Sequence, residues 1–98
     1  NMQFTLIAYD YKNGGLERRL AARAEHIALG DKMKTEGNYL MGVALLDENE
    51  KMTGSVMVLD YPSRKKLDDW LKIEPYVVNN VWEKYEIIQC SVGPSFLK

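Results

Sequence analysis

The first two segments of the chain differ in how apolar and polar positions are spaced. Phe4 to Tyr9 is a short, mostly apolar run that ends before Asn13-Gly14-Gly15, where glycine readily adopts turn conformations, so it predicts a strand. A helix is predicted from Leu16 to Glu36, because no proline interrupts this stretch, with its end at Gly37-Asn38. The apolar side of this helix is a stripe at helical spacing, formed by Leu16, Leu20, Ala24 and Ile27.

The middle of the chain predicts a hairpin followed by a second helix. Two apolar runs, Tyr39 to Leu46 and Gly54 to Tyr61, flank a polar turn at residues 47–51. Ser63 is placed to cap a helix from Arg64 to Lys72, because its hydroxyl oxygen accepts hydrogen bonds from the free N–H groups of a first helical turn. The side chains expected to face inward from this helix are Leu67, Trp70 and Leu71.

The last third of the chain completes a βαββαβ order. Glu74-Pro75 is expected to end the second helix, residues 75–80 to form a connection, and Val81 to Cys90 to supply the last strand. This order predicts an α+β fold of ferredoxin-like topology, a four-stranded antiparallel sheet with both helices on one face. The 98 residues are expected to form a single domain over residues 1–98, and Asn1 before Met2 is interpreted as the remnant of an expression tag.

Three predicted strands are apolar on both of their faces, whereas a sheet with one wet face should alternate apolar and polar residues. Two helices on one side leave the other side of such a sheet uncovered. A second copy of the same sheet is the simplest cover, so we predict a homodimer through the open sheet face, a dimeric α/β barrel. The runs concerned are residues 4–9, 39–46 and 56–59.

Composition narrows the classes of partner and chemistry. Thirteen Lys and Arg against fourteen Asp and Glu give a net charge of -1, which argues against a nucleic-acid partner. No apolar run approaches the roughly 18 residues that span a bilayer, so we expect no membrane partner and a cytoplasmic location. One His and one Cys cannot supply a usual zinc site, and the motifs for nucleotide and acyl-serine chemistry are absent. We therefore expect no metal and no cofactor.

His26 is the best candidate for a chemical residue. It is the only histidine, and it lies on the first predicted helix beside the apolar stripe. A partly buried imidazole takes and returns a proton near neutral pH when a carboxylate or carbonyl orients its ring. Glu74 is a candidate for that carboxylate, because the proline after it places it at a chain reversal. The ordinary alternatives are a hydrogen-bonded helix histidine and a solvated glutamate in a helix-ending turn.

Arg23 and Gly42 are weaker candidates. Arg23 lies one turn before His26, where it would meet an anionic substrate or an acidic side chain, although a solvated face is the default interpretation for Arg18, Arg19 and Arg23. Gly42 leaves out a side chain in an apolar strand, which makes room either for a ligand or for a bulge or close backbone contact. The aromatic residues Tyr9, Tyr39, Trp70 and Trp82 are interpreted as core or dimer-interface residues.

The order and spacing of these pieces resemble the YciI-like (YCII-related) family over nearly the whole chain. The resemblance implies a dimeric ferredoxin-like barrel with a His-Asp pair in its cleft and, in at least one branch, a dehydrochlorinase acting on a chlorinated hydroxymuconate. Glu74 stands where the family motif has aspartate, and Gly42-Val43 where Gly-Pro is usual. The matching pieces are Arg23-Ala24-Glu25-His26, Lys51-Met52-Thr53-Gly54-Ser55, Trp70, Glu74-Pro75-Tyr76 and residues 81–87.

Two functions follow as hypotheses from different classes. The first is a cofactor-independent lyase, isomerase or hydrolase with a small anionic organic substrate, in which His26 is the general acid/base and Glu74 orients it. The second is a non-catalytic ligand-binding or regulatory dimer that uses the same cleft. An RNA-binding module is excluded by the third strand, which lacks the stacking aromatics of that class, and a quinol or haem oxygenase ranks low. The expected substrate-binding residues are Arg23, Tyr76, Gly42 and Ser55.

Overall fold

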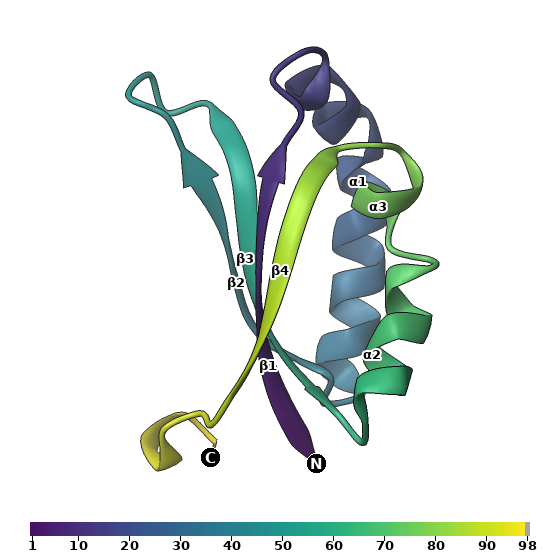
Figure 1. Ribbon diagram of the computed structural model, residues 1–98, viewed down its shortest axis with the longest axis vertical. Helices are drawn as coiled ribbons and strands as arrows, with labels where there is room; N and C mark the ends of the chain where they lie inside the picture. The colour runs from purple at the N-terminus through teal and green to yellow at the C-terminus, as the bar shows by residue number, and fades with distance from the viewer. Residues whose placement is uncertain (98) are drawn as a thin grey trace.

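The computed structural model describes residues 1–97 as one four-stranded antiparallel sheet with its helices on a single side (Figure 1). The strand order is β2-β3-β1-β4, so the predicted βαββαβ order and ferredoxin-like α+β fold are confirmed. The elements are β1 (Met2–Asp10), α1 (Gly15–Thr35), β2 (Tyr39–Leu46), β3 (Met52–Tyr61), α2 (Arg64–Leu71), α3 (Pro75–Val78), β4 (Trp82–Cys90) and the 3-10 turn η1 (Pro94–Phe96).

The end of α1 lies where the sequence predicts it. Gly37 adopts a φ of 85°, a left-handed conformation that suits glycine because it has no Cβ. The backbone N–H of Asn38 then donates to the carbonyl of Met33 at 2.8 Å, which satisfies a helix carbonyl that would otherwise be free. The chain therefore turns sharply from α1 into β2 and brings the start of β2 against the helix.

The α2 helix also forms for the predicted reason. The Ser63 hydroxyl accepts a hydrogen bond from the Lys66 N–H at 3.2 Å. Residues 75–80 differ from the expected connection, because Pro75 begins the short helix α3. A proline suits the first position of a helix, where its N–H would be unpaired anyway and its fixed φ is already helical. Pro75 thus begins α3, in addition to its expected role of preventing α2 from continuing.

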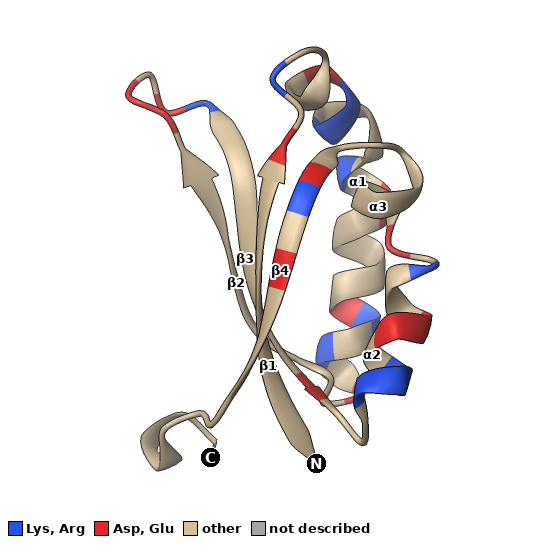
Figure 2. Ribbon diagram, in the orientation of Figure 1, with Lys and Arg blue, Asp and Glu red and all other residues tan. Residues whose placement is uncertain are grey.

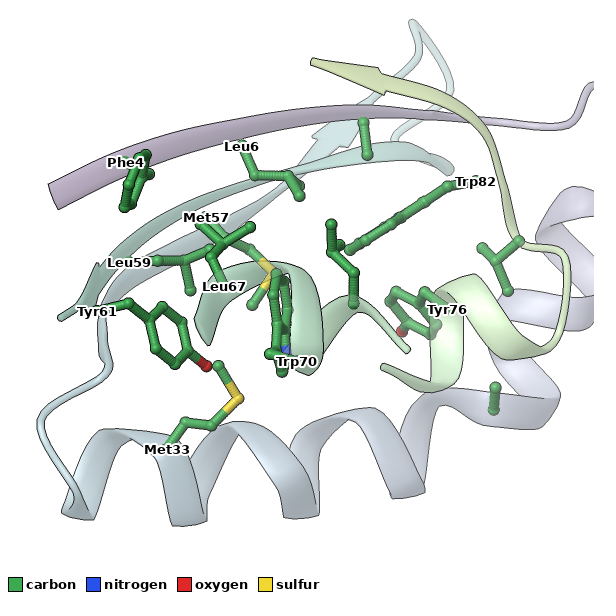
Figure 3. Packing of buried hydrophobic residues seen from close by; sticks show 14 residues of the cluster. Phe4, Leu6, Met33, Met57, Leu59, Tyr61, Leu67, Trp70, Tyr76 and Trp82 are labelled. Atoms are coloured by element: carbon green, nitrogen blue, oxygen red, sulfur yellow. The ribbon is translucent and has the colours of Figure 1, made fainter. Parts of the chain in front are cut away.

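The core lies between the sheet and the helices. Leu6 of β1 pairs with Met57 of β3 in register, and both side chains point toward the helices. Figure 3 shows Leu67 and Trp70 of α2 packed over them. The strands are apolar here: β2 has no charged residue, and β1 has none before its last residue, as Figure 2 shows.

The buried side of α1 is not the apolar stripe that the sequence suggested. Leu20 is 57% exposed and Ile27 is 43% exposed, whereas Arg19 is 2% exposed and Met33 is 4% exposed. The helix is therefore rotated relative to the expectation. The physical reason is that Asp10, buried at the end of β1, pairs with Arg19, and this ion pair fixes which side of α1 faces the sheet.

The other side of the sheet stays uncovered in this chain. We call it the open face, and it carries Met41, Val43, Val56, Val58 and Ile88. Met41 is 56% exposed, Val43 50% and Ile88 49%, which is a large apolar area for a chain of this size. Among residues 1–97, no helix is both long and apolar enough to cross a membrane.

Candidate functional site

A cavity of about 240 Å³ lies between α1 and the helix-facing side of the sheet. Every residue that the sequence predicts for the site lines this cavity, except Glu74, which lies behind it in contact with His26. The fold therefore brings together residues that are far apart along the chain. The predicted residues in the wall are Arg23, His26, Gly42, Ser55 and Tyr76.

The imidazole of His26 is held by a buried carboxylate. Its Nδ1 forms a hydrogen bond with Oε1 of Glu74, and the Glu74 side chain is only 1% exposed. This contact fixes the ring in its own plane and leaves Nε2 as the nitrogen without a hydrogen bond among residues 1–97. Glu74 stands where the resemblance implies an aspartate, and its longer side chain reaches the ring.

Tyr76 holds the His26 ring from its face. The ring centroids of His26 and Tyr76 are 3.9 Å apart and the planes are nearly parallel, at 11°. Glu74 and Tyr76 are separated only by Pro75, so the start of α3 supplies both an in-plane hydrogen bond and a stacking surface. Trp82 supports Tyr76 from the edge, with centroids 5.9 Å apart (Figure 3).

Arg19 is one of two polar residues of the cavity wall that sequence reasoning missed, and Tyr39 is the other. Its guanidinium donates to both carboxylate oxygens of Asp10, at 2.7 and 3.0 Å, and to the Ser55 hydroxyl at 2.7 Å. It also lies 4.6 Å above the ring centroid of Tyr76. The solvated face expected for it is wrong, because these partners replace the water that a free guanidinium would need.

The burial phase of β1 explains why Asp10 needs a buried partner. Phe4, Leu6 and Ala8 of β1 alternate with more exposed residues, and Asp10 continues the same phase. A carboxylate in phase with a buried face needs a buried partner, and Arg19 is the one on the adjoining helix. Both phases of β1 contain apolar residues, so the pairing is evident only once the structure shows which phase is buried.

The remaining wall residues play different parts. Arg23 is exposed at the edge of the cavity, and within residues 1–97 no acidic side chain pairs with it. The hydroxyl of Ser55 already binds Arg19. The sequence left open room for a ligand or a bulge or close backbone contact at Gly42, and the structure adds another cause, because a Cβ at this position would lie 1.5 Å from the hydroxyl oxygen of Tyr39. The missing side chain makes room for the Tyr39 phenol.

The phenols of the cavity stay neutral at ordinary pH. Burial raises the pKa of Tyr76 above its usual value, although the nearby guanidinium groups of Arg19 and Arg23 oppose the shift. Burial also raises the pKa of Tyr39, and the negative charge of Glu74 adds to the effect. Both hydroxyls are therefore hydrogen-bond donors. No three His, Cys, Asp or Glu side chains in the described part of the chain gather closely enough to hold a metal ion.

Comparison with known proteins identifies similar sequences. The profile of the YCII-related domain matches residues 2–91. An uncharacterized protein of Haemophilus influenzae is 31% identical over 87 residues, which is 83% of this chain and 88% of that protein. Protein YciI of Escherichia coli O6:H1 is 28% identical over 92 residues, which is 88% of this chain and 93% of that protein.

Solved structures share the fold. A 5-chloro-2-hydroxyhydroquinone dehydrochlorinase of Burkholderia phenoliruptrix, solved in complex with 2,5-dihydroxybenzoquinone, superimposes with a TM-score of 0.82 at 18% identity, covering 96% of this chain and 98% of that one. At this identity the likeness concerns the fold, and the name of that protein gives a chlorinated hydroxyhydroquinone as the compound on which it acts. An antibiotic biosynthesis monooxygenase superimposes with a TM-score of 0.56 at 14% identity, covering 96% and 100%.

Proposed function

The chain belongs to the YCII-related family, and from that premise we propose that it is an enzyme acting on a small anionic organic molecule, with His26 as the general acid/base. One observation carries the proposal: a cavity-lining imidazole is oriented by a buried carboxylate on one edge and by a stacked phenol on one face. A base fixed in two directions needs no reorganisation at the moment of proton transfer.

In this proposal the two ring nitrogens of His26 have different roles. Nδ1–H donates to Glu74, so Nε2 is the nitrogen that accepts a proton from the substrate and returns it. When Nε2 takes a proton the ring becomes cationic, and the Glu74 carboxylate stabilises that cation. This chemistry is proton transfer, as in isomerisation or elimination, and it needs only groups that this chain carries.

The charges around the cavity favour an anionic substrate. Arg19 is neutralised by Asp10, whereas Arg23 has no acidic partner within residues 1–97. A carboxylate or phenolate of the substrate would therefore pair with Arg23 at the edge of the cavity. The dehydrochlorinase that shares this fold was solved with 2,5-dihydroxybenzoquinone, which is a small oxygenated ring compound.

We also propose that the protein works as a homodimer. The open face is apolar and half-exposed at Met41, Val43 and Ile88, and a second copy placed across it would cover this area. Sedimentation at micromolar concentration should give the mass of two chains. Val58→Glu, which puts a charge in the middle of the open face, should shift the protein to one chain, and a monomeric wild-type protein would contradict the proposal.

Hydrogen exchange into substrate carbon in D₂O tests the acid/base proposal without knowledge of the net reaction. A panel of small enolisable acids and hydroxyquinones is incubated with protein and followed by NMR. We expect catalysed exchange for at least one compound, and a loss of about 10²- to 10⁴-fold in His26→Ala. Glu25→Ala, an exposed neighbour on α1, is the matched control and should keep the wild-type rate.

The same experiment separates the enzyme from the ligand-binding alternative. If panel compounds bind the wild-type protein but none exchanges in a manner that depends on His26, the cavity is a binding site without proton-transfer chemistry. His26 would then be a hydrogen-bonding part of the wall, and the non-catalytic ligand-binding dimer would be the better account.

A further inference from the structure

Tyr39, which the sequence suggested was a core or interface aromatic, is held in the cavity wall by two glycines. A Cβ on Gly42 of β2 would lie 1.5 Å from the Tyr39 hydroxyl oxygen, and a Cβ on Gly30 of α1 would lie 3.2 Å from its Cε2 atom. The ring therefore occupies space that a helix and a strand both leave free. Gly30 follows His26 by one helical turn, so the Tyr39 ring lies beside the turn that carries the imidazole.

The hydroxyl of Tyr39 is available to a ligand. It lines the same cavity as His26 and Arg23, and no hydrogen-bond partner for it exists within residues 1–97. The raised pKa that comes from burial and from the charge of Glu74 keeps this phenol protonated, and hence a donor, well above neutral pH. Leaving a half-buried donor without a partner costs free energy compared with its hydrated state, unless a ligand or solvent oxygen accepts its hydrogen bond.

Packing alone does not account for this arrangement. A phenylalanine would fill the space between α1 and β2 equally well without a polar atom over Gly42. Gly42 and the hydroxyl are instead matched to each other, because the distal end of the phenol occupies the position of the absent side chain. The cavity thus has a proton acceptor on its helix wall, His26, and a hydrogen-bond donor on its sheet wall, Tyr39.

We propose that Tyr39 donates a hydrogen bond to a substrate oxygen while His26 exchanges a proton at a neighbouring atom, so that the site takes small planar oxo or hydroxy compounds. This inference rests on the proposed acid/base role of His26. The Nε2 atom of His26 removes a proton from the carbon next to a carbonyl, the C–H electron pair forms a C=C bond, and the carbonyl π pair moves to oxygen. The resulting oxyanion accepts from Tyr39 and is balanced by Arg23. The oxygen pair then re-forms the carbonyl, and the C=C pair either takes the proton back from His26, at another carbon when the double bonds are conjugated, or expels a leaving group from the adjacent carbon. In the second case the leaving group departs with its electron pair and His26 gives its proton to that group or to water.

Binding of 2,5-dihydroxybenzoquinone, measured by titration calorimetry on the full chain, tests this inference. The compound is planar and carries oxygens around its ring, so the wild-type protein should bind it. Tyr39→Phe keeps the ring and removes only the hydroxyl, and we expect about 10-fold weaker binding, the usual effect of losing a hydrogen bond to a charged or polarised oxygen. Tyr11→Phe, which changes an exposed phenol outside the cavity wall, is the matched control and should bind as the wild type does.

The outcomes distinguish this inference from the role of His26. Equal binding by the wild-type protein and Tyr39→Phe would overturn the hydrogen bond from Tyr39, while the His26 proposal would still be decided by the exchange experiment. Failure of the wild-type protein to bind the quinone would overturn the substrate class and with it the part given to Tyr39. Loss of His26-dependent exchange with intact, Tyr39-dependent quinone binding would leave Tyr39 as a ligand-binding residue and remove the catalytic part of the proposal.

Discussion

The helices α1 and α2 cover the same face of the sheet, but they bury different kinds of side chain. α2 buries Leu67, Trp70 and Leu71, an ordinary apolar stripe. α1 buries Arg19 and most of His26, while Leu20 and Ile27 of its apolar stripe stay exposed. The difference shows that α2 contributes mainly hydrophobic burial, whereas the orientation of α1 depends on the ion pair of Arg19 with Asp10 and on the hydrogen bond of His26 with Glu74. Of these two helices, the one that carries candidate site residues is α1, which has a less regular apolar side than α2. This is expected where function competes with packing.

Removing Arg19 tests the ion pair that orients α1, and it should lower the unfolding free energy more than any other change proposed here. Arg19→Met leaves the Asp10 carboxylate buried without its partner, and breaking a buried pair from one side costs about 4 kcal/mol of unfolding free energy. Urea denaturation at pH 7 measures it. Adding Asp10→Asn to Arg19→Met should restore much of the loss, because the unpaired charge is gone. A change below about 1 kcal/mol in the single variant would contradict the account.

Truncating Leu67 tests the apolar packing of α2. Leu67 is fully buried, so Leu67→Ala should cost about 3 kcal/mol through lost burial and the cavity left behind. Leu67→Met conserves volume and should cost less than about 1.5 kcal/mol in the same urea experiment. For neither variant should the loss of unfolding free energy change with pH between 5 and 8, and a strong dependence would mean that α2 also relies on charge.

The loss of stability at alkaline pH also tests the apolar packing of α2, because Tyr61 packs beside Trp70 of this helix. Burial raises the pKa of Tyr61 to about 12. The unfolded phenol ionises near pH 10, so the stability that the neutral buried form contributes is complete below pH 10 and is lost as the pH rises toward 12. Tyr61→Phe should therefore show a shallower fall in melting temperature across this window than the wild-type protein. Parallel curves would show that Tyr61 titrates normally.

The exposed apolar stripe of α1 should matter least. Leu20 is 57% exposed, so Leu20→Ser should change the unfolding free energy by no more than about 0.5 kcal/mol. Urea denaturation again provides the measurement, with Leu67→Ala as the contrasting leucine. A cost near that of Leu67→Ala would mean that Leu20 is covered in solution and that α1 is rotated from the position described.

Most of the fold follows from the sequence, because its determinants are local. The turn at Gly37, the Ser63 cap and the inward residues of α2 each depend on neighbours a few positions away. The pairing of His26 with Glu74 was also predictable, through the Glu74-Pro75-Tyr76 motif of the family resemblance. These features come from single residues with strong local preferences.

What the sequence did not reveal depends on contacts between distant elements. Arg19 and Asp10 are both charged, and a hydropathy pattern places such residues in solvent unless their pairing is already known. The space for the Tyr39 ring is left by Gly42 of β2 and Gly30 of α1 together. Neither glycine marks a turn, so no local pattern in the sequence points to this space. Helical periodicity therefore predicted the wrong buried side of α1, because it scores apolarity and not the energy of a specific ion pair.

The tautomer of His26 is the most direct test of the central claim, that a buried carboxylate orients this imidazole for proton transfer. Long-range ¹⁵N–¹H NMR on an untagged protein gives an unambiguous answer, since the chain has one histidine. At a pH where the ring is neutral, we predict that Nδ1 carries the proton and Nε2 is free, and that Glu74→Gln weakens this preference. A wild-type ring protonated at Nε2, or a tautomer unaffected by Glu74→Gln, would contradict the account.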